Sequence, residues 1–192
     1  MRRALAALAC VLLGGCVYSL EPFYAKESLV ASPVAAGKWR RMDKDGQAER
    51  GETWEFTADR IVVQDDRGQW RALDAKYFRV GNKTFVDTFP RDLGNESPSE
   101  AYWALHRAPF HMLSRVEVAG DRVVAYPLAA SERFRELARE APFARRSVER
   151  GDYASFVFGV GAADWKAFLE QHGSDDAVFE PKAQMVFVRA RE

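Results

Sequence analysis

The stretch WRALDAKYFRVGNKTFVDTF, residues 70–89, decides the fold class of this chain. Two runs rich in β-branched and aromatic residues, Trp70–Val80 and Lys83–Phe89, flank the turn residues Gly81-Asn82. Such a turn between two such runs is typical of a tight hairpin, and Pro90 is expected to end the second strand. The stretch therefore predicts a pair of antiparallel strands.

The same rhythm continues on both sides of this hairpin. Turn residues interrupt β-type runs about every eight to twelve positions, as at Asp65–Gly68 and Ala119–Asp121, which favours an antiparallel barrel or sandwich. The further predicted strands are Lys38–Met42, Thr53–Thr57, Ile61–Gln64, Met112–Val118, Arg122–Leu128, Tyr153–Val160 and Gln184–Ala190. The expected fold is thus mainly β, with about nine strands.

Two short surface helices complete the expected secondary structure. Ser131 is a good N-cap for a helix that runs to about Glu140, just before Pro142. A second helix is predicted over Ala162–His172, with Gly173 as its C-terminal stop. Both segments carry an apolar stripe on one face, so we expect each helix to pack on the sheet.

Several motifs carry a resemblance to known families. Gly37-Lys38-Trp39 resembles the G-x-W motif that opens the lipocalin fold. Ser19–Tyr24, Trp54-Glu55-Phe56 and Thr84–Pro90 resemble segments of uncharacterised bacterial lipoproteins with a lipocalin-like barrel, a group without an established activity. The resemblance implies a single antiparallel lipocalin-like barrel of about eight to nine strands.

The later half of the chain departs from a classical lipocalin. Gly151-Asp152-Tyr153 is similar to the T-D-Y motif, but one strand and then a helix follow it, where a pair of strands is expected. The helix predicted over residues 131–140 also interrupts the meander. Strand order and barrel closure therefore stay open at the level of sequence.

The N-terminus is typical of an exported protein. Met1-Arg2-Arg3 is followed by the apolar run Ala4–Leu13 and two glycines, the pattern of a signal peptide over residues 1–15. Leu13-Gly14-Gly15-Cys16 resembles the lipobox of bacterial lipoproteins, which implies acylation of Cys16. Because Cys10 lies in the removed segment, no thiol is left for a disulfide or a cysteine metal site.

The mature chain divides into two parts in this interpretation. Residues 16–36 are expected to form the acylated N-terminus and a tether that packs on the domain from about Leu29, and residues 37–192 the barrel domain. The composition, 47% hydrophobic and 12% aromatic, is that of a folded globule. Loss of Arg2 and Arg3 takes the net charge from zero to about −2, which argues against a nucleic-acid partner.

Candidate chemistry is sparse. Asp87 alternates with Phe85 and Phe89, so it is expected to be buried with them, either as a functional carboxylate or as an acceptor for an arginine or backbone amides. His106 and His111, with Asp92 and Glu96 upstream, have neither helical nor strand spacing for a shared metal. The aromatic residues could line a ligand cavity or fill a core; they are Trp39, Trp54, Phe56, Trp70, Tyr77, Phe85 and Phe89.

The sequence predicts no catalytic, cofactor-binding or metal-binding residue, and Cys16 is its one assigned site. The expected function is that of a non-enzymatic lipoprotein of the bacterial cell envelope, on the outer membrane because Val17 is not the aspartate that retains enterobacterial lipoproteins at the inner membrane. Two non-enzymatic roles stay open, beside an enzymatic role that no catalytic motif supports. One is binding of a small lipophilic ligand in the barrel, and the other is a structural, assembly or protein-interaction role through the 91–109 loop or the helix faces.

Overall fold

The structure of this chain is a computed structural model. It describes residues 15–49, 51–64, 68, 70–91, 110–145, 147–150, 155–179 and 181–191. Residues 1–14 of the predicted signal peptide, most of the 91–109 loop and the Gly151-Asp152-Tyr153 motif lie outside the described residues. None of the helices described is both long and apolar enough to cross a membrane.

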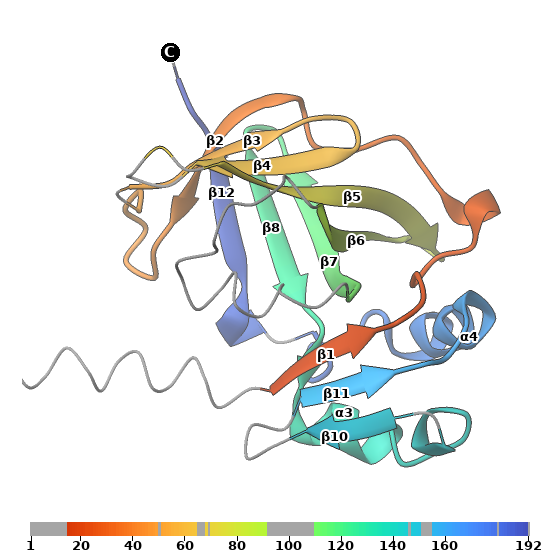
Figure 1. The fold of residues 1–192 in the computed structure, drawn as a ribbon. Coiled ribbons are helices and arrows are strands. Elements are labelled where there is room, and N and C mark those ends of the chain that lie inside the picture. The colour runs from red at the N-terminus through yellow and green to blue at the C-terminus, as the bar shows by residue number, and fades with distance from the viewer. Residues whose placement is uncertain are drawn as a thin grey trace, which may run out of the picture.

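Eight antiparallel strands close into a barrel, which confirms the predicted fold class (Figure 1). They follow one another around the wall in chain order, and β12 closes the ring between β8 and β2. The strands are β2 (Gly37–Met42), β3 (Thr53–Phe56), β4 (Arg60–Gln64), β5 (Trp70–Val80), β6 (Lys83–Arg91), β7 (Met112–Ala119), β8 (Arg122–Pro127) and β12 (Met185–Arg189).

The hairpin of β5 and β6 is the longest ladder in the wall. Its register runs from Val80↔Lys83 to Ala72↔Arg91, and Gly81 has a φ of 58°, a conformation that favours glycine. The prediction that Pro90 ends β6 is wrong, because Pro90 pairs with Leu73. Since β7 pairs with β6 only as far as Thr88, a proline beyond that point removes no hydrogen bond on that side.

The barrel interior is filled by aromatic and aliphatic side chains. Trp39 is fully buried and its ring meets Phe56, while Phe187 contacts both Trp54 and Phe56 at ring-centre distances of 5.0 and 5.3 Å. Val34 packs into the same cluster, so the segment before β2 covers one end of the barrel. The complete interior cluster is Val34, Trp39, Trp54, Phe56, Ile61, Val63, Leu73, Ala75, Tyr77, Val86, Val116, Val123 and Phe187.

A second sheet lies beneath the barrel and was not predicted (Figure 1). Its order is β10 (Ser147–Arg150), β11 (Ser155–Phe158), β1 (Gly15–Ser19) and β9 (Ala129–Ala130). Strand β1 runs parallel to β11 and antiparallel to β9. The described residues thus contain twelve strands, more than the nine expected, and the strand predicted up to Val160 is seen as β11, which ends at Phe158.

Two α-helices and three short 3-10 helices complete the described secondary structure. α4 (Ala162–His172) has the predicted bounds, and Gly173 follows it. α3 (Glu132–Leu137) is capped as expected by the Ser131 hydroxyl, which accepts a hydrogen bond from the Phe134 amide, but the helix ends before Glu140. The short 3-10 helices are η2 (Lys26–Ser28), η4 (Phe143–Arg145) and η5 (Pro181–Ala183).

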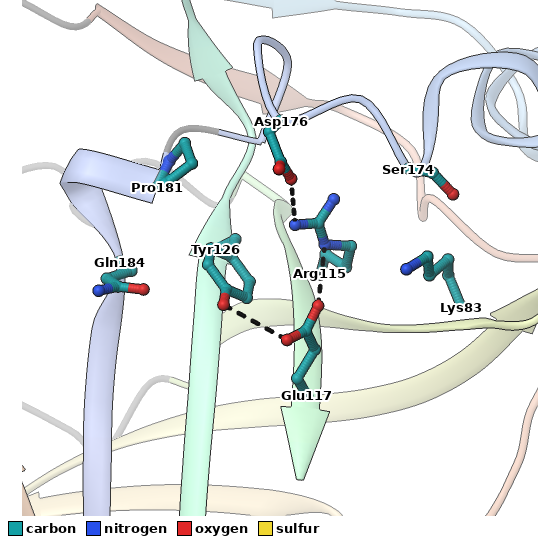
Figure 2. A pocket seen from close by; sticks show the side chains of 8 residues that line it. All are labelled: Lys83, Arg115, Glu117, Tyr126, Ser174, Asp176, Pro181 and Gln184. Carbon is teal, nitrogen blue, oxygen red and sulfur yellow. Dashed lines mark hydrogen bonds and ion pairs between the residues drawn. The ribbon is translucent and has the colours of Figure 1, made fainter.

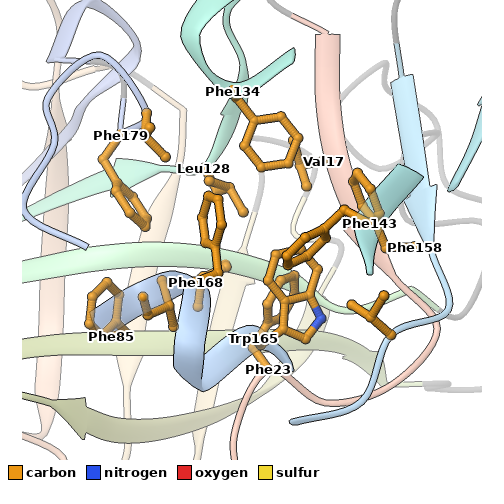
Figure 3. Packing of buried hydrophobic residues seen from close by; sticks show 14 of the residues in the cluster. Val17, Phe23, Phe85, Leu128, Phe134, Phe143, Phe158, Trp165, Phe168 and Phe179 are labelled. Atoms are coloured by element: carbon orange, nitrogen blue, oxygen red, sulfur yellow. The ribbon is translucent and has the colours of Figure 1, made fainter. Parts of the chain in front are cut away.

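The second hydrophobic core fills the space between the barrel wall and this lower layer (Figure 3). Tyr77 and Val86 point into the barrel, so their neighbours Phe78 and Phe85 point outward and pack against the lower layer. Trp165 of α4 is fully buried there, among Phe23, Phe143, Phe158 and Phe168.

The N-terminal segment is part of the fold rather than a tether. Val17, Tyr18 and Phe23 are all buried, and β1 pairs with β11 from Val17 onward. The prediction of a tether over the earlier half of residues 16–36 is therefore wrong. Packing from about Leu29 is observed, because Leu29 bridges to Phe78 and Val34 joins the barrel core. The burial of two aromatic side chains outweighs the small and proline residues that favoured a flexible segment.

Candidate functional site

Asp87 lies at the junction between the barrel and the lower layer. It projects from the outer face of β6 and is only 2% exposed, so its predicted burial is confirmed. One carboxylate oxygen accepts a hydrogen bond from the Phe23 amide at 3.0 Å, and the other lies 2.9 Å from Nδ1 of His111. Of the two predicted roles, the acceptor of a backbone amide is the one observed.

Burial raises the pKa of the Asp87 carboxyl above its ordinary value of 3.8, because removal of water penalises the charged form. The hydrogen bond and the charge of His111, and then the Phe23 amide, oppose that rise. Asp87 and His111 join the N-terminal segment to the barrel. Asp87 accepts from the Phe23 amide, and the backbones of His111 and Ser19 exchange two hydrogen bonds.

Ser19 is buried near this pair, and its hydroxyl is already bonded. It accepts hydrogen bonds from the Trp165 indole at 3.2 Å and from the Glu21 amide at 3.2 Å. Ser19 is 0% exposed, so a substrate has no access to its oxygen. These bonds give the serine a structural role between β1 and α4.

Replacement of Asp87 by asparagine is expected to change the pH dependence of stability. Because the folded protein holds the Asp87 proton more tightly than the unfolded chain, the contribution of Asp87 to stability is lost as pH rises from about 3.8 through the raised pKa. The asparagine side chain cannot titrate, so the wild type's free energy of unfolding should fall relative to that of Asp87→Asn across this window. Urea unfolding at a series of pH values between about 3.5 and 7 measures the difference.

Asp45→Asn is the matched control for this experiment, because Asp45 is exposed in the β2–β3 connection. Its curve is expected to run parallel to that of the wild type. A wild type that gains stability relative to Asp87→Asn as pH rises would contradict the raised pKa.

A polar pocket of about 350 Å³ opens on the outer face of the same barrel wall (Figure 2). Register places Arg115 beside Phe85 on β6 and Tyr126 on β8, and all three point away from the barrel interior. The pocket residues of the barrel wall are Lys83, Arg115, Glu117 and Tyr126; those after α4 are Ser174, Asp176, Pro181 and Gln184.

Arg115 forms the floor of this pocket, and its side chain is only 5% exposed. Nη2 donates to the Asp176 carboxylate at 2.7 Å, and Nη1 to the Gly173 carbonyl at 3.5 Å. The guanidinium also lies 4.7 Å from the ring centre of Tyr126 and 5.6 Å from that of Phe179. Arg115 therefore joins the segment after α4 to the barrel wall.

Gly173 allows the end of α4 to lie close to the barrel wall. A Cβ atom at this position would lie 2.5 Å from the Leu169 carbonyl oxygen and 2.8 Å from the Phe85 ring. The glycine predicted as a helix stop thus also brings the end of α4 against β6, beside Arg115.

The other residues proposed from sequence as site candidates are not grouped together among the described residues. His111 pairs with Asp87, whereas His106, Asp92 and Glu96 lie outside the described residues. In the described ranges, no three His, Cys, Asp or Glu side chains are grouped to hold a metal ion. Cys16 lies in β1, where its backbone pairs with Ala129.

The aromatic residues proposed to line one cavity also separate. Trp39, Trp54, Phe56 and Tyr77 pack inside the barrel. Phe85 and Phe89 instead lie on its outer face, where Phe89 contacts His111 at 4.6 Å between ring centres, and Trp70 is 44% exposed. These seven residues therefore do not surround one ligand.

Comparisons of the chain with protein-family models, with curated proteins and with solved structures find no match. The closed eight-stranded antiparallel barrel is consistent with a lipocalin-like architecture.

Proposed function

We propose that this chain is a lipid-anchored protein of the bacterial cell envelope, acylated at Cys16, that acts by surface recognition rather than by catalysis. The observation that carries the recognition role is the packed barrel. Trp39, Trp54, Phe56 and Phe187 contact one another across the interior, and Val34 covers one end. A lipophilic ligand inside the barrel would have to separate these side chains, so the filled-core alternative is the better supported one.

The polar groups at the junction support a non-catalytic role. The Asp87–His111 pair binds the N-terminal segment to the barrel, and the Ser19 hydroxyl is bonded to Trp165 and Glu21. These groups stabilise the contact between the two layers. The accessible chemistry lies instead in the polar pocket around Arg115, on the protein's surface.

The position of Cys16 fits a short, rigid attachment. Its backbone pairs with Ala129 at the start of β1, so an acylated Cys16 would be joined directly to the folded sheet. Two or three acyl chains hold a protein stably at a bilayer, at about 0.8 kcal/mol per buried methylene group. In this proposal the domain lies close to the membrane surface, on the outer membrane and facing the periplasm, since Val17 is not the inner-membrane retention signal.

Metabolic labelling with palmitate tests the anchor. The full chain, expressed in a bacterial host, is expected to incorporate the label and to fractionate with the outer membrane, whereas Cys16→Ser incorporates none. Label retained by Cys16→Ser, or an unlabelled and soluble wild type, would refute acylation at this residue.

Native mass spectrometry of the full chain carrying Cys16→Ser tests the filled core. The expected mass is that of the polypeptide alone, because the aromatic side chains of the interior pack against one another. A stoichiometric co-purified lipid that is lost when Val34 is replaced by tryptophan would instead place the ligand in the barrel.

A further inference from the structure

The pocket around Arg115 contains a buried cationic donor without an acceptor. Nε of Arg115 is the one buried side-chain nitrogen or oxygen, among the described residues, that has no hydrogen-bond partner. The nearest carboxylate oxygen, from Glu117, lies 3.8 Å away, which is beyond hydrogen-bond distance. Because a buried and unpaired donor on a charged group is costly, this N–H calls for an acceptor that the described residues do not supply.

Lys83 supplies a second cationic side chain to the same pocket. It lies two residues before Phe85 on β6 and therefore on the same outer face. Within the described residues its side chain forms no ion pair or hydrogen bond. Figure 2 shows its ammonium group directed toward the guanidinium of Arg115. Two cationic groups with free donors thus face one space.

Neither of the two carboxylates in the pocket accepts a hydrogen bond from Nε of Arg115. Asp176 is bound to Nη2 of Arg115 on the side away from Lys83, as Figure 2 shows. Glu117 is half-exposed, and one of its oxygens accepts a hydrogen bond from the Tyr126 hydroxyl at 3.3 Å. The donors left over are Nε of Arg115 and the ammonium of Lys83, and both favour a negatively charged oxygen.

We propose that this pocket binds the anionic oxygen group, carboxylate or phosphate, of a small polar molecule. The group binds Nζ of Lys83 and meets the guanidinium of Arg115, where a small side-chain shift uncovers the buried Nε. The volume of about 350 Å³ is at the lower end of the range for small-molecule sites. Ser174 and Gln184 offer neutral hydrogen-bonding groups to the rest of the ligand. Glu117, beside Nε, opposes the bound anion and limits its affinity.

The anion site supplies a ligand class for the proposed surface recognition. It rests on the proposed function only in that the pocket lies on the protein's surface. Anion binding at Arg115 requires no acyl group, and palmitate labelling of Cys16 requires no pocket. Each can therefore fail without the other.

Nitrogen–proton NMR of the full-length protein in detergent tests the site directly, because a buried arginine Nε–H gives its own signal. Inorganic phosphate and acetate are titrated separately, and the Arg115→Lys spectrum assigns the signal. We expect a saturable shift of the Arg115 Nε–H signal with at least one anion, and the tighter of the two identifies the ligand group.

Two pocket variants are expected to act in opposite directions. Lys83→Met should weaken binding by about tenfold, the loss typical of one charge-assisted hydrogen bond. Glu117→Gln should tighten it, because it removes a competing negative charge. Lys44→Met, which removes an exposed lysine in the β2–β3 connection, is the matched control and should leave the affinity unchanged.

An Arg115 signal unmoved by both anions at tens of millimolar would overturn the proposal. Equal weakening by Lys83→Met and Lys44→Met would also overturn it, because the binding would then reflect net charge rather than a built site.

Discussion

Trp165→Ala is expected to lower the free energy of unfolding by about 3–5 kcal/mol, the usual cost of deleting a large buried aromatic side chain. Trp165 is 0% exposed, and its ring centre lies 4.5 Å from that of Phe23 and 4.9 Å from that of Phe143. Its indole also donates to the Ser19 hydroxyl, so the substitution leaves a cavity and removes one buried hydrogen bond. Urea unfolding followed by circular dichroism measures the loss.

Trp70→Ala is the matched control. Trp70 is 44% exposed on the outer face of β5, so its truncation is expected to cost clearly less stability than that of the fully buried Trp165. Similar losses from both substitutions would show that the second core does not hold the two layers together.

The barrel could be predicted from sequence because most of its strands combine local turn signals with a core-facing pattern. In Thr53–Phe56 the buried Trp54 and Phe56 alternate with half-buried residues, and the hairpin of β5 and β6 has its Gly81 turn at the predicted position. Both features depend on neighbours along the chain. They therefore remain visible without knowledge of the tertiary structure.

The second sheet could not be predicted because its pattern depends on distant contacts. Val17, Tyr18 and Ser19 are consecutive and all buried, so β1 shows no alternation between an inner and an outer face. Its partner in parallel pairing is β11, more than a hundred residues away in sequence. Strands covered on both faces lose the period of two that marks a strand in sequence.

The pocket was missed for a related reason. Leu113, Arg115 and Glu117 share the outer face of β7, and in sequence such a row is typical of a solvated strand face. Only the segment after α4 buries Arg115, through Asp176 and the Gly173 carbonyl. Asp87 was found because Phe85 and Phe89 flank it, although that face proved to be the outer one.

Removal of β1 is expected to destabilise the protein more than its length suggests. A chain that begins at Leu20 lacks Val17 and Tyr18, whose burial contributes about 1.5–3 kcal/mol each, and also the pairing with Phe156–Phe158. A loss of at least about 3 kcal/mol is expected relative to a chain that begins at Val17. Urea unfolding gives the difference, and binding of a hydrophobic dye reports the exposed second core.

Both shortened chains lack Cys16 and its pairing with Ala129. The difference in stability between them therefore reports the loss of residues 17–19 and not the loss of the anchor. If the chain from Leu20 does not fold, Val17→Ala in the longer chain gives a graded loss, since it removes two buried methyl groups from the same strand. Equal midpoints for all three chains would mean that the N-terminal strand does not hold the lower layer. The residues after Cys16 would then be free to act as the flexible tether that their composition first suggested.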